Sequence, residues 1–207
     1  MTSKDPELSA AIRHDEALEI LGKGFRFIRD KTKPGDAETL GIAGGISKRK
    51  WNDLGQIKDL MRAAELYQRG AANDLKQDPY PHINAAFIDD LLAAAGDQPE
   101  GRRKRAAALR QKIPDNSDWW TVATRAEALF GLGRYDDATK ALERVEKSEK
   151  RALWKLRTMA EQLAQLAHLQ AKMRSADGVR EPDPLEDAAS TDSSRRCCPV
   201  PRTRSVR

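Results

Sequence analysis

Residues 119–145 constrain the fold more than any other stretch, because they encode two helices and the turn between them. Ala126 is a small residue on the inner face of the first predicted helix. Gly133 suits the helix end, since glycine adopts a left-handed conformation without steric cost. Apolar residues then recur at helical spacing on the second predicted helix: Tyr135, Ala138, Leu142 and Val145. The pattern predicts a helical hairpin, and one hairpin cannot bury its apolar face without neighbouring hairpins.

The rest of the chain supplies these neighbours. Apolar residues recur at helical spacing in residues 7–31, 37–47, 60–70, 80–96 and 153–173. We expect a long connection over 48–59, a loop over 96–101 and a short basic helix over 102–113. Charged residues make up 33% of the chain and hydrophobic residues 39%, a balance that favours an all-α protein. The helix 153–173 suits a cap on the last hairpin or a homodimer seam, and we favour the cap.

Residues 119–145 resemble a tetratricopeptide repeat, with Gly133, Tyr135 and Ala138 at the signature positions of turn and second helix. The wider series ETLGIAGGISKRKW, AAELYQRG, YPHINAAFIDDLLAAAG and ALFGLGRYDDATKAL resembles the TRAF-binding region of mitogen-activated-protein-kinase kinase kinases and its bacterial relatives. Its most specific piece surrounds Tyr80 and Asn84, with His82 at the family's glycine position. The resemblance implies helical hairpins stacked as a short tetratricopeptide-like α-solenoid with a C-terminal capping helix.

The resemblance also implies a non-catalytic scaffold or regulatory module, which binds a protein or peptide partner in the groove of the repeat array. The effector domain would belong to a larger polypeptide. The predicted groove residues are Tyr80, Asn84, Trp120 and Arg125. The alternative is a nucleic-acid-binding helical module that uses the basic run Arg102, Arg103, Lys104 and Arg105 and the Arg-rich tail. No aromatic residues interleave with this run, which favours a solvated helix start.

Catalytic signatures are missing from the sequence. It has no kinase motif, and the run GIAGG at residues 41–45 lacks the context of a phosphate loop, so close helix packing is expected there. His14 is expected to be solvent-exposed, and Asn84 to satisfy local backbone donors. Cys197 and Cys198 cannot form a disulfide framework or a zinc site alone. We therefore expect no enzyme, no cofactor and no metal.

The chain has no apolar run long enough to span a membrane, so we expect a cytoplasmic protein. Three regions are predicted. Residues 1–6 form a frayed N-terminus, residues 7–173 form the repeat domain, and residues 174–207 form a disordered tail because they contain few apolar residues.

Overall fold

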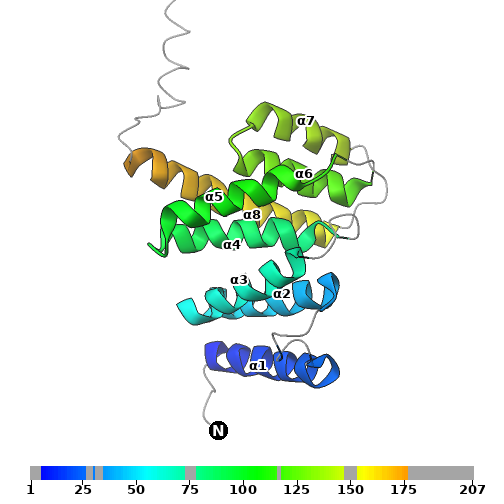
Figure 1. Ribbon diagram of the computed structural model, residues 1–207, viewed down its shortest axis with the longest axis vertical. Helices are drawn as coiled ribbons and strands as arrows, with labels where there is room; N and C mark the ends of the chain where they lie inside the picture. Colours follow the sequence, from blue (N-terminus) through cyan, green and yellow to red (C-terminus); the bar gives the residue numbers. More distant parts are fainter. Residues whose placement is uncertain are drawn as a thin grey trace, which may run out of the picture. The chain divides into compact units, whose positions relative to one another are not determined.

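The computed structural model describes residues 6–26, 30, 35–72, 78–115, 118–146 and 153–176. Within them it has eight α-helices and no strand, so the predicted all-α class is confirmed (Figure 1). The helices are α1 (Pro6–Gly24), α2 (Ala37–Leu54), α3 (Ile57–Ala71), α4 (Tyr80–Ala94), α5 (Pro99–Lys112), α6 (Trp119–Gly131), α7 (Tyr135–Glu146) and α8 (Leu153–Ala176). Met1–Leu169 form one compact unit, and Gln170–Arg207 form a second. Cys197, Cys198 and most of the predicted tail lie outside the described residues.

Three hairpins build the first unit: α2 with α3, α4 with α5, and α6 with α7. α1 packs on α2, and α3 packs on α4, so the hairpins follow one another as layers (Figure 1). Asp36 and Asp118 begin two of the first helices, since each carboxylate accepts a hydrogen bond from a backbone N–H three residues on. Gly133 ends α6 with a left-handed φ of 74°, as predicted. The unit is a tetratricopeptide-like α-solenoid.

The run GIAGG lies inside α2 and faces two tyrosines. A Cβ atom on Gly44 would lie 3.0 Å from the ring of Tyr67, and one on Gly41 would lie 3.1 Å from the ring of Tyr80. The rings therefore pack directly on the α2 backbone. Close helix packing, predicted for this run, is confirmed.

The hairpin predicted over 119–145 forms, with Ala126 and Ala138 buried in one cluster. α8 covers this hairpin through Met159, which joins the same cluster, so the predicted cap is confirmed. The helix also reaches further, because Leu166 packs in the cluster formed by α3 and α4.

Three predicted boundaries were wrong. α2 continues through residues 48–54, where we expected a connection, because no helix breaker precedes Gly55 with its left-handed φ of 66°. The first helix ends at Gly24 rather than near Lys31. α5 begins at Pro99 rather than Arg102, since proline fits the first helical turn, where its missing N–H needs no partner.

His14 was also wrongly expected to face solvent. Its Nε2 lies 2.7 Å from Oδ2 of Asp53, and its side chain is only 18% exposed. The contact joins α1 to the end of α2, a segment that had been predicted as a loop. The partner of His14 could not be found while residues 48–59 were treated as a connection.

Arg110 of α5 fills the space left by a glycine. Its side chain is 2% exposed, and Nη2 lies 2.6 Å from Oδ2 of Asp90. A Cβ atom on Gly131, the last residue of α6, would lie 2.3 Å from Nε of Arg110. The buried ion pair holds Arg110 in place, so only glycine fits opposite it.

We expect Gly131→Ala to lower the free energy of unfolding by about 1–3 kcal/mol, because the added methyl group overpacks a side chain that cannot move away. Gly101→Ala is the matched control. Its Cβ atom would meet nothing within 4 Å, and alanine in a helix is favoured over glycine by about 0.5–1 kcal/mol. Urea denaturation of both variants measures the difference. Equal stability of the two variants would contradict the packing described.

Candidate functional site

A groove runs along the first helix of each hairpin and is bordered by α8. It consists of three adjoining cavities that share Tyr80 and Thr158. The largest has a volume of about 320 Å³. The residues that line the groove as a whole recur at helical spacing on each helix. They include Gly45, Lys48, Arg49 and Asn52 of α2, Tyr80, Ile83 and Asn84 of α4, Trp120, Thr124 and Glu127 of α6, and Thr158, Met159, Gln162 and Gln165 of α8.

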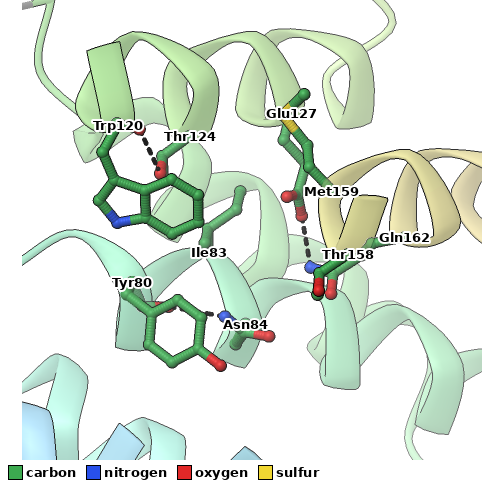
Figure 2. A pocket seen from close by; sticks show the side chains of 9 residues that line it. All are labelled: Tyr80, Ile83, Asn84, Trp120, Thr124, Glu127, Thr158, Met159 and Gln162. Carbon is green, nitrogen blue, oxygen red and sulfur yellow. Dashed lines mark hydrogen bonds between the residues drawn. The ribbon is translucent and has the colours of Figure 1, made fainter. Parts of the chain in front are cut away.

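Tyr80 and Trp120 form the aromatic part of the groove (Figure 2). Their ring centroids lie 6.3 Å apart, and Tyr80 also meets the buried ring of Tyr67 edge to face at 6.0 Å. Burial raises the pKa of Tyr67 and Tyr80, so both remain neutral phenols. The glycines of α2 allow this placement, because any larger residue at Gly41 would displace the ring of Tyr80.

Gln162 of α8 bridges the half-buried Lys48 and the buried Glu127 at the floor of the groove. Its Oε1 accepts a hydrogen bond from Nζ of Lys48 at 2.8 Å, and its Nε2 donates to Oε1 of Glu127 at 2.5 Å. Figure 2 shows Glu127 reaching from α6 toward Gln162 on α8. Lys48 also donates to Oδ1 of Asn84 at 3.2 Å and lies 5.3 Å from the ring centre of Phe87. One amide thus links α2, α6 and α8.

Burial disfavours the charged forms of both partners in this network. It lowers the pKa of Lys48 to about 8, although the charge of Glu127 acts in the opposite direction. It raises the pKa of Glu127 to about 7, against the hydrogen bond from Gln162 and the charge of Lys48. The cavity lined by Glu127 has a volume of only about 20 Å³, room for about one water molecule.

Arg49 follows Lys48 on α2 and differs from it in environment. It is exposed and lines both larger cavities of the groove. Its guanidinium group makes no ion pair or hydrogen bond with any residue that the structure describes. The exposed side chain of Ile42 lies on the same helix and lines the largest cavity. The groove therefore offers a cation, aromatic rings and an apolar side chain together.

Of the predicted groove residues, Tyr80, Asn84 and Trp120 line one cavity. Arg125 lies elsewhere, where it donates to the carbonyl oxygen of Ile113 at 2.7 Å and lines a separate cavity beside α7. Asn84 bonds a backbone group at the start of its helix, the structural role expected of it, but as a donor to a carbonyl oxygen rather than as an acceptor. Its Nδ2 donates to the carbonyl oxygen of Tyr80 at 3.0 Å, while its Oδ1 faces Lys48.

Two residues of the basic run of α5 form ion pairs inside the protein. Arg102 and Arg105 both donate to the fully buried carboxylate of Asp89, each at 2.7 Å. Arg103 and Lys104 are exposed. Half of the predicted basic patch thus neutralises an acidic residue of α4.

Lys48, Glu127 and Gln162 were not predicted from the sequence. A signal for Glu127 was present, since it lies seven residues after Trp120 and therefore on the same helix face. Arg125 lies five residues after Trp120, a spacing that turns it away from that face. Gln162 gave no such signal, because a glutamine on an amphipathic helix normally faces water.

Two further properties concern all residues that the structure describes. No three His, Cys, Asp or Glu side chains gather as a metal site among the residues that the structure describes. No described helix is long and apolar enough to cross a membrane.

The raised pKa of Glu127 predicts a pH dependence of stability. A folded-state pKa of about 7, against 4.5 for an ordinary glutamate, means that folding favours the protonated carboxyl. Its contribution to stability is fully present below pH 4.5 and is lost as the pH rises through about 7. Relative to Glu127→Gln, the wild-type free energy of unfolding should fall by about 2–4 kcal/mol across this range. Urea denaturation at several pH values, with the exposed Glu143→Gln as control, measures it. Parallel pH curves for wild type and Glu127→Gln would refute the assignment.

One of three comparisons with known proteins gave a match, and that match covers the N-terminal part of the solenoid. A comparison with curated proteins and one with solved structures each gave no match. Residues 6–89, which contain α1, α2, α3 and the groove-lining part of α4, match the family model described as Tetratricopeptide Repeats-Sensor. This match supports a tetratricopeptide-like repeat family, in which the repeats mediate protein–protein interaction and are typically non-catalytic.

Proposed function

We propose that this chain is a non-catalytic regulatory module that binds a segment of a partner protein in the groove. The observation that carries the proposal is Arg49, a cation with no ion-pair partner among the described residues, which lines the same cavity as Tyr80 and Trp120 on the face formed by the first helices. Tetratricopeptide-like arrays bind partners on this face. The aromatic rings supply contact area at low entropic cost, and Arg49 supplies a site for a partner's carboxylate.

The charges of the groove indicate the chemistry of the partner. Glu38 and Asp78 line the same cavity as Arg49. We therefore infer a segment of mixed charge with apolar residues, whose acidic side chain pairs with Arg49. Lys48 is already hydrogen-bonded to Asn84 and Gln162, so it is not the primary contact. Glu127 has too small a cavity to act on a substrate, which supports a non-catalytic role.

The biological setting is part of the same proposal. The family description includes the word sensor, and the sequence resembles the TRAF-binding region of signalling kinases. Both suit a cytoplasmic module that reports a binding event to an effector domain or protein. Residues 7–173 would form this module, and residues 174–207 are given no role in binding.

A pair of variants tests groove binding against the nucleic-acid alternative. The full chain serves as bait in lysate with and without nuclease treatment, as wild type, as Arg49→Glu and as the control Arg103→Glu/Lys104→Glu on α5. We expect Arg49→Glu to reduce recovery of a defined protein about tenfold or more, because it places an acid opposite the partner's acid. The α5 variant should retain that protein. Loss confined to the α5 variant, together with nuclease-sensitive recovery, would overturn the proposal.

A further inference from the structure

α8 occupies part of the groove that a partner would use. Its Thr158 lines all three cavities, and Met159 and Gln162 line one of them together with Thr124, whose side chain is buried. Gln162 of α8 makes two hydrogen bonds in the groove, one with Lys48 and one with Glu127. The chain's own helix therefore closes the floor of the site.

Few residues of α8 are fully buried in this position, although Leu156 and Leu163 are partly buried against the α6–α7 cluster. Only Met159, Gln162 and Leu166 are buried among its residues 156–173, whereas α4 buries every residue from 81 to 89. Helices within a hairpin approach one another backbone to backbone, but α8 meets the groove mainly through the ends of its side chains. Elements with few buried contacts open at lower free energy than the core.

The Gln162 bridge also keeps two charges away from water. While α8 is docked, Lys48 and Glu127 share one neutral amide and are both desolvated. Undocking breaks two hydrogen bonds but lets water reach both charges, which offsets part of the loss. The bridge is thus a contact that can be exchanged for solvent or for polar groups of another chain.

We propose that α8 is a detachable occupant of the groove, which undocks as a unit when the Gln162 bridge breaks and gives its place to the partner segment. The replacement of α8 by a partner segment rests on the proposed function. Undocking itself is a property of the chain alone. The device makes groove binding depend on how firmly α8 is held.

Thiol labelling tests undocking without a partner. In the full chain with Cys197→Ser and Cys198→Ser, Thr124→Cys places a buried thiol in the cavity that Met159 and Gln162 of α8 also line. Ala43→Cys places one in the core between α1, α2 and α3, a cluster to which α8 does not contribute. Reaction with iodoacetamide should be about tenfold or more faster at residue 124 than at residue 43, since local opening is cheaper than global unfolding.

Substitutions that weaken the docking of α8 should change the labelling rate at residue 124 and not the rate at residue 43. Gln162→Ala is expected to speed labelling at residue 124 about tenfold and to leave residue 43 unchanged, because it removes hydrogen bonds to two charged groups. Leu166→Ala, which weakens the other end of the contact, should give the same pattern. Equal labelling at both positions, or a parallel increase at both in these variants, would show only global unfolding and overturn undocking.

A peptide of residues 153–173, labelled with fluorescein, tests displacement. It should bind the Gln162→Ala chain about tenfold more tightly than wild type, because the variant's own α8 competes less well for the groove. Equal affinity for the two chains would overturn displacement. If the peptide behaves as expected while Arg49→Glu keeps its lysate partner, the proposed function fails and the detachable helix stands.

Discussion

Three glycines of α2 let tyrosine rings lie directly against its backbone, and the groove depends on that contact. Gly44 faces Tyr67, while Gly41 and Gly45 leave room for Tyr80. A side chain at Gly41 or Gly44 would push the tyrosine rings of α3 and α4 away, since interiors are close-packed and cannot absorb the added volume. Tyr80 would then lose its place beside Trp120, and Lys48 its distance to Asn84 and Gln162. The glycines weaken α2 as an isolated helix but give the first two hairpins their close approach.

The protein places its charges differently on the two sides of α4. On the side of α5, Asp89 and Asp90 are matched by arginines at direct hydrogen-bonding distance. On the groove side, Lys48 and Glu127 meet only through the amide of Gln162. The direct hydrogen bonds that Asp89 accepts from Arg102 and Arg105 compensate for its lost hydration, whereas a bridged pair remains sensitive to the group that bridges it. This contrast explains why α5 is a fixed part of its hairpin and why the groove depends on α8.

Helical spacing predicted much of the groove, and its failures have physical causes. Tyr80 and Trp120 were predicted from their positions at the start of two first helices. Glu127 shares the face of Trp120, but it was not predicted, because the pattern followed along this hairpin was that of the small and apolar residues. Arg49 was hidden because residues 48–59 were assigned to a connection, so its helix face was not considered. Because the end of one helix was predicted wrongly, half of the groove-lining residues of α2 were not considered.

The sequence by itself determined the helices, their caps and the existence of stacked hairpins, because capping, glycine turns and apolar spacing act over a few residues. Gly133, Asp118 and the alanines of the last hairpin specify their own surroundings. Only the tertiary structure decided that Lys48, Glu127 and Gln162 meet, since these residues come from α2, α6 and α8. Each is an ordinary surface residue by local pattern. Their burial and altered pKa values follow from the packing of distant segments, which no short window of sequence contains.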